Sequence, residues 1–102
     1  MTAEPKELAV PFSALQSESA TEVLRAWIVD NGLHVSLQRG FDDPAVWGVL
    51  LTDIARHVAR VYETEGFGSQ REALSKIRSA LDAEWDEGSD LEPQARSSRI
   101  KE

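Results

Sequence analysis

The sequence predicts an α+β fold, a two-layer sandwich in which two antiparallel helices pack on a small antiparallel β-sheet. Two observations predict it. Residues 22–39 hold two β-rich runs on either side of an Asn-Gly step, the strongest short signal for a β-hairpin. Residues 44–65 and 70–87 then repeat apolar side chains at the spacing of one helix face. Because a two-stranded hairpin is marginal in water by itself, the helices are expected to cover one of its faces.

The hairpin is expected to turn at Asn31 and Gly32, since both central residues of a type I′ turn need a positive φ. This turn would set Ile28 opposite Val35, with the neighbouring pairs in step. One face of the hairpin is then apolar, and the helices can pack against it.

The N-terminal segment, residues 1–20, is expected to be partly extended. Residues 7–12 include a short apolar run that gives a possible N-terminal edge strand beside the hairpin. Pro11 fits an edge position, because an edge strand can lack one backbone donor without losing the ladder.

The first helix is expected over about residues 44–65. Asp43 is a good N-cap, and Pro44 fits the first helical position, where the backbone N–H has no helical partner in any case. Gly66 ends the helix. The side chains expected to form its apolar face are Trp47, Leu50, Leu51, Ile54, Val58, Val61 and Tyr62.

The second helix is expected over about residues 70–87. Ser69 and Glu72 have the spacing of a capping box, in which each side chain accepts a hydrogen bond from the other residue's backbone N–H. Gly88 ends this helix, and the short link makes the two helices antiparallel neighbours. The apolar face is Leu74, Ile77, Leu81 and Trp85, and we expect both Trp47 and Trp85 to lie in the core.

Residues 1–87 are therefore expected to form a single α+β domain. Residues 88–102 are polar and lack periodicity, so the sequence predicts a disordered tail there.

The composition argues against several classes of function. The chain of 102 residues has 18 acidic against 11 basic residues and a net charge of −7, so nucleic acid and anionic membrane surfaces would both be repelled. It has no cysteine, which excludes disulfides, thiolate catalysis and cysteine–zinc sites. No secretory signal and no bilayer-spanning apolar run are apparent, so a cytoplasmic protein is the expectation.

The hairpin face turned away from the helices is too apolar for free solvent. It carries Val23, Trp27 and Val29 beside Arg25. Either the N-terminal segment covers this face or another chain does, and exposed apolar patches commonly mark interaction surfaces. We therefore expect an interface at Val23, Trp27 and Val29, anchored by Trp27, in a homodimer or with another protein partner.

Arg78 and His57 support an alternative function. Arg78 lies within the apolar stripe of the second helix, where its head can reach Asp82 or hold an anion in the groove between helices and sheet. His57 follows Asp53 by one helical turn, a spacing that can orient a general base but is also ordinary on a helix surface. The alternative is thus a small anionic-ligand binder or a minor enzyme. No metal-ligand spacing matches, and no cofactor is expected.

Several segments carry a resemblance to a known family: residues 22–27, 34–37, 43–48, 53–60 and 82–84. Together they resemble a family of small proteobacterial proteins, the domain of unknown function DUF5076. The resemblance covers about residues 20–87, implies a compact α+β fold in a bacterial cytoplasmic protein, and implies no activity. The leading interpretation is a non-catalytic protein-interaction module that self-associates through its open sheet face.

Overall fold

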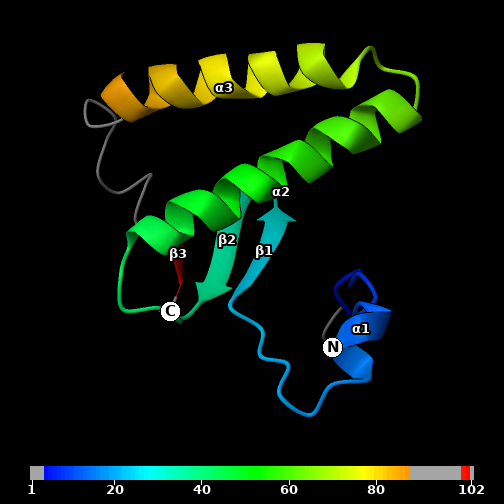
Figure 1. The fold of residues 1–102 in the computed structure, drawn as a ribbon, viewed down its shortest axis with the longest axis vertical. Coiled ribbons are helices and arrows are strands. Elements are labelled where there is room, and N and C mark those ends of the chain that lie inside the picture. The colour runs from blue at the N-terminus through cyan, green and yellow to red at the C-terminus, as the bar shows by residue number, and fades with distance from the viewer. Residues whose placement is uncertain (1–3, 88–99, 102) are drawn as a thin grey trace.

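The computed structural model describes residues 4–87 and 100–101 of the chain. Its elements in chain order are α1 (Phe12–Leu15), β1 (Leu24–Val29), β2 (Gly32–Leu37), α2 (Ala45–Thr64), α3 (Gln70–Glu87) and β3 (Ile100–Lys101). Figure 1 shows α3 running back along α2, with the hairpin on the side of α2 away from α3. The predicted α+β fold is confirmed, and the bounds of both long helices agree with prediction to within one residue at either end.

The hairpin turns at Asp30 and Asn31, and not at Asn31 and Gly32. Both residues have left-handed φ angles, 51° and 66°, and their short polar side chains tolerate that region. Gly32 instead begins β2, opposite Val29. The turn predicted from the Asn-Gly step is therefore wrong by one position, because Asp can supply the first left-handed residue as well as Asn can.

The predicted strand register is consequently wrong by two residues. Ile28 pairs with Leu33 rather than with Val35. Side chains alternate along a strand with a period of two, so this shift leaves every side chain on its predicted face. Val35 and Ile28 share the face toward the helices, and Trp27 lies on the other.

The possible edge strand at residues 7–12 does not form. Residues 4–11 have no regular secondary structure, and Phe12–Leu15 form the helical turn α1. Pro5 and Pro11 lack the backbone N–H that a strand ladder needs, and the Pro11 carbonyl accepts from the Ala14 N–H at 3.0 Å to close α1.

The third strand comes from the other end of the chain. β3 pairs in parallel with β2, Val35 lying opposite Ile100, so the sheet order is β1-β2-β3. The rest of the predicted tail, residues 88–99 and 102, lies outside the described residues.

The start of α2 follows the predicted pattern. Pro44 already has helical angles, φ −62° and ψ −19°, and the Asp43 carboxylate accepts from the Ala45 N–H at 3.0 Å. Asp43 thus satisfies one of the backbone donors that the first helical turn leaves free.

The turn between α2 and α3 is held by a glycine and by three side-chain hydrogen bonds. Gly66 has a φ of +86°, a region that side chains rarely adopt. The Glu72 N–H donates to Ser69 Oγ at 3.0 Å, and the Ser69 N–H donates to Glu72 Oε1 at 3.2 Å, so the predicted capping box forms in both directions. The Gln70 N–H also donates to Glu63 Oε2 at 3.2 Å, which ties the start of α3 to the end of α2.

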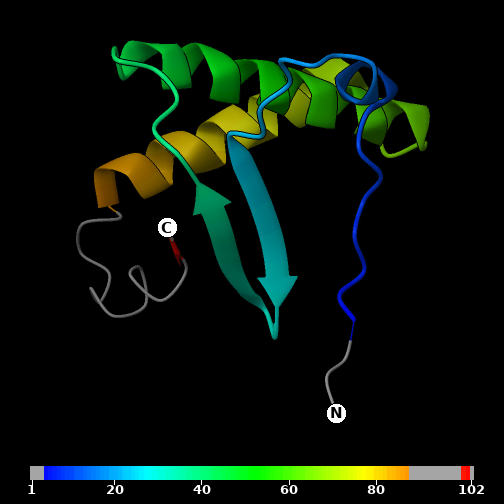
Figure 2. The ribbon, with the colours of Figure 1, turned by 90° about the horizontal axis from the view of Figure 1, so that it is seen from below.

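The two long helices diverge from this turn, as Figures 1 and 2 both show. Ala59 of α2, near the turn, is completely buried. Trp85, at the far end of α3, is 79% exposed. The prediction that Trp85 lies in the core is therefore wrong, because α3 has moved away from α2 before the stripe reaches it.

Trp47 is half-buried at the other end of α2. Its Nε1 donates to the Arg39 carbonyl at 2.7 Å. Its ring meets Phe41 edge-on, with ring centroids 6.2 Å apart. Trp47 thus joins α2 to the segment that leaves the hairpin.

Figure 2 shows the hairpin projecting from the helix pair as an arm. Val35, toward its base, is 8% exposed, whereas Ile28, next to the turn, is 74% exposed. Contacts are extensive between β1 and β2 and between α2 and α3, but among the described residues no helix contacts a strand to that extent. The two layers meet chiefly at the base of the hairpin.

The capping box makes a testable contribution to stability. Ser69→Ala is expected to lower the free energy of unfolding by about 1 kcal/mol, because the Glu72 N–H loses its acceptor. Chemical denaturation at one fixed protein concentration measures it. The control is Ser79→Ala, an exposed serine inside α3, which is expected to change stability by less than about 0.5 kcal/mol. Equal effects of the two substitutions would contradict the capping role.

Candidate interaction surface

Large apolar side chains are exposed on the hairpin and on both long helices. Among the described residues only Val35 and Ala59 are buried. We define the open apolar surface as Ile28 and Leu33 of the hairpin, Leu51, Ile54 and Val58 of α2, and Leu81 and Trp85 of α3. Soluble monomers seldom expose contiguous apolar patches beyond a few hundred Å² unless the patch binds something.

The α2 members of this surface lie close to or between two sides of the helix that are already occupied. Ala59 marks the side in contact with α3, and Trp47 marks the side nearest the hairpin. At about 100° per residue, Val58 and Leu51 fall between these two sides, and Ile54 falls about 20° beyond Trp47. Leu51 and Val58 therefore face the space that α3 and the hairpin leave between them.

The hairpin members belong to the face that looks toward the helices. Ile28 and Leu33 are cross-strand partners, and both share that face with buried Val35. The α3 members extend a stripe whose earlier residues, Leu74 and Ile77, are half-buried against α2. The hairpin and α3 are thus each covered where they lie close to α2 and exposed farther from it.

The predicted interface residues lie together on the opposite face of the sheet. Val23 and Trp27 are half-buried, and Val29 is exposed. Trp27 lies directly across from His34. We call Val23, Trp27 and Val29 the Trp27 face.

Arg25 covers part of the Trp27 face. Its guanidinium lies over the Trp27 ring, 5.9 Å from the ring centroid. Arg25 Nε donates to Glu22 at 3.1 Å, and Nη1 donates to Glu7 at 2.7 Å. The hydrogen bond and charge of Glu22, followed by the charge of Glu7, raise the pKa of Arg25 above its usual value. Glu7 thereby holds the N-terminal segment against the hairpin.

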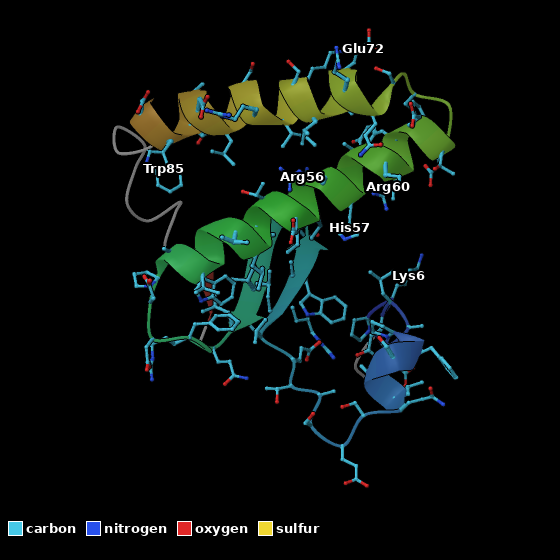
Figure 3. The ribbon with its side chains drawn as sticks, in the orientation of Figure 1. Lys6, Arg56, His57, Arg60, Glu72 and Trp85 are labelled. Atoms are coloured by element: carbon cyan, nitrogen blue, oxygen red, sulfur yellow. The ribbon has the colours of Figure 1, made fainter. Side chains whose placement is uncertain are left out.

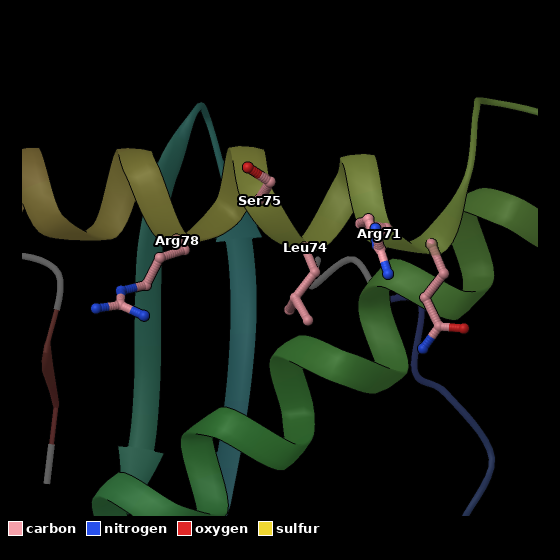
Figure 4. Close-up of a pocket in the computed structure, with 5 residues that line it drawn as sticks. Arg71, Leu74, Ser75 and Arg78 are labelled. Carbon is pink, nitrogen blue, oxygen red and sulfur yellow. The ribbon is translucent and has the colours of Figure 1, made fainter.

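The structure does not place the two predicted ligand-binding residues in one site. Figure 4 shows a shallow groove formed by α3 alone, lined by Gln70, Arg71, Leu74, Ser75 and Arg78. His57 does not line it. Figure 3 shows His57 on the side of α2 away from α3. Arg78 is 76% exposed, and its Nε pairs with Asp82 at 3.1 Å, one turn along the helix.

Buried charge, metal-ligating clusters and membrane-spanning helices can also be sought in the part of the chain that the structure describes. No polar or charged residue is buried there. No group of three or more metal-ligating side chains converges within residues 4–87 and 100–101. None of the described helices combines the length and apolar character needed to cross a membrane.

The chain belongs to the family described as a domain of unknown function, DUF5076, which matches residues 7–88. It is also similar to a solved structure described as a putative pyruvate dehydrogenase from the photosynthetic bacterium Rhodopseudomonas palustrus CGA009. The two chains are 42% identical with a TM-score of 0.67, and the similarity covers 83% of this chain and 99% of the other. No curated protein matches.

The open apolar surface was not predicted from the sequence. Its helix members were predicted on apolar helix faces, and Trp85 in the core, but helical periodicity shows that residues share a side and not that anything covers it. The length of the strands could have indicated it. Six strand residues extend about 20 Å, whereas one helix lying across them is only roughly 10 Å wide, so a single helix leaves part of the hairpin uncovered.

Substituting Arg78 tests whether its ion pair with Asp82 contributes to the stability of the fold. Arg78→Gln is expected to change the free energy of unfolding by less than about 0.5 kcal/mol, because an exposed pair one helical turn apart contributes little. Thermal and chemical denaturation measure the change. A loss of several kcal/mol would show that Arg78 supports the fold in some other way.

Proposed function

We propose that this protein is a non-catalytic, self-associating interaction module of the bacterial cytoplasm. The observation that supports the proposal is the open apolar surface, set against the two buried residues of the described chain. Apolar surface of this extent favours association, because covering it removes it from water at about 25 cal/mol per Å². Because these side chains lie on the hairpin, α2 and α3, a second protein surface is large enough to cover them together.

The Trp27 face supplies a further surface for a protein partner. Trp27 is a large amphipathic side chain of the kind that dominates binding energy when it is buried centrally. Arg25, stacked on its ring and paired with Glu22 and Glu7, gives this face a polar rim of both charges. The sequence-based interface at Val23, Trp27 and Val29 therefore stays part of the proposal.

The similar structure described as a putative pyruvate dehydrogenase suggests a context for such a module. We carry over no catalytic role from that description, because the proposal rests on the exposed apolar side chains. An interaction module could instead serve within a larger dehydrogenase assembly. Affinity capture from native cytoplasm with the full-length chain, read by mass spectrometry, would then recover subunits of that enzyme.

Trp27→Ser tests the Trp27 face. The substitution is expected to abolish capture of a protein, whether another partner or a further copy of the chain, that the unaltered chain retains through this face. Light scattering after size exclusion measures the mass, and capture measures the partners. Leu8→Ser is the matched control, because Leu8 is a fully solvated apolar residue outside both surfaces. An unchanged mass and partner set in Trp27→Ser would remove the Trp27 face from the proposal.

The second candidate is a small anionic-ligand binder. The observation that favours it is the pair of guanidinium groups, Arg71 and Arg78, lining the groove on α3 with Leu74 between them. Its predicted partner, His57, lies outside this groove, and Asp82 already neutralises Arg78. A thermal-shift screen against phosphate and small carboxylates tests it: stabilisation that Arg78→Gln removes would favour the ligand binder.

A further inference from the structure

We propose that a second copy of this chain covers the open apolar surface, the hairpin arm of each copy lying against the α3 end of the other. This inference rests on the proposed self-association and names the surfaces that meet. Three features carry it: the area left exposed, the distribution of charge around it, and the position of the hairpin.

The exposed area matches what a dimer needs. At about 150–200 Å² for a fully exposed large side chain, the exposed fractions of the seven residues leave roughly 600 Å² of mainly apolar area on each copy. A specific interface buries about 800 Å² per partner, of which the outer part is a polar rim. The open apolar surface is thus large enough to form the apolar centre of a stable dimer.

The charges select which elements can meet. The last two turns of α3 carry Asp82, Glu84 and Asp86, so two α3 ends placed side by side would bring like charges together. Arg25 and His34 lie on the opposite face of the hairpin, and the strand residues that share the face of Ile28 and Leu33 carry no charge that would repel these carboxylates. The hairpin of a second copy therefore fits against the acidic end of α3 better than a second α3 does.

The position of the hairpin allows the arm of each copy to contact the α3 end of the other at the same time. Figure 2 shows the arm reaching away from its own helices, and its outer pair, Ile28 and Leu33, lies on the same sheet face as buried Val35. In a dimer with two-fold symmetry, Ile28 of one copy meets Trp85 of the other, and the reverse contact forms with the same geometry. The pairing covers the arm and the α3 end together.

Cross-linking between copies tests the contact directly. The chain has no cysteine, so Leu33→Cys and Leu81→Cys each introduce the only thiol of their chain, and every disulfide formed on mixing them joins two copies. The expected result is a mixed disulfide between these two variants. The control mixes Leu33→Cys with Lys76→Cys, an exposed position on the polar face of α3, and is expected to give no mixed disulfide above background.

Substitutions test the energetics. Trp85→Ser and Ile28→Asp are each expected to raise the dimer dissociation constant at least ~10-fold, as loss of a central anchor does. Sedimentation equilibrium measures the constant, and far-ultraviolet circular dichroism checks that the helices remain. Leu8→Ser, at a residue 92% exposed and outside the surface, is expected to leave the constant unchanged.

The outcomes separate this inference from the proposed function. A chain that stays at its monomer mass of 11.3 kDa at all concentrations would overturn both. A dimer that forms no Leu33–Leu81 cross-link, and whose dissociation constant is the same in Trp85→Ser and Ile28→Asp, would overturn the arm-to-α3 contact and leave self-association standing. If a substitution unfolds the chain, the cysteine pair decides.

Discussion

The architecture depends on how much of α2 its own chain can cover. α2 is apolar around nearly half of its circumference. α3 buries the side at Ala59, and the segment after the hairpin shelters the side at Trp47. Fully burying one large apolar side chain stabilises a fold by about 1.5–3 kcal/mol, so leaving several half-exposed forfeits much of a total stability of about 5–15 kcal/mol. The uncovered side of α2 is therefore where covering by another surface would stabilise the fold most.

Local signals in the sequence predicted the parts of the fold that local chemistry determines. Ser69 and Glu72 form both hydrogen bonds of the predicted capping box, and Asp43 caps α2 as expected. The hairpin was predicted in the correct place with the wrong register, because Asp30 and Asn31 can both adopt left-handed angles. The two-residue error left each face intact, which is why Trp27 lies on its predicted face.

The candidate site was less predictable, because it depends on how far elements diverge. Trp85 continues a regular stripe, and nothing in the sequence shows that α3 has left α2 by the time the stripe reaches it. The pairing of Arg78 with His57 assumed a shared groove between helices and sheet, whereas the groove at Arg78 lies on α3 alone. Crossing angles arise from side-chain packing along the whole contact, which no short motif encodes.

An open apolar surface in an acidic protein raises the question of why it would not aggregate. The net charge of −7 opposes indiscriminate collapse, but charge alone does not limit the number of copies. Two-fold symmetry limits the number of copies to two. The arm and the α3 end belong to the same chain, so when the arm of each copy lies against the α3 end of the other, the open apolar surface of both copies is used and none of it remains for a third copy. If instead one arm engaged one α3 end without the return contact, the free surfaces would continue the chain of contacts into a filament. Ile28 and Leu33 lie on the same sheet face as buried Val35, which is the face that the proposed closed arrangement uses. The geometry that leaves this chain incompletely covered is thus compatible with the proposed closed dimer, in which no part of the open apolar surface is left for a third copy.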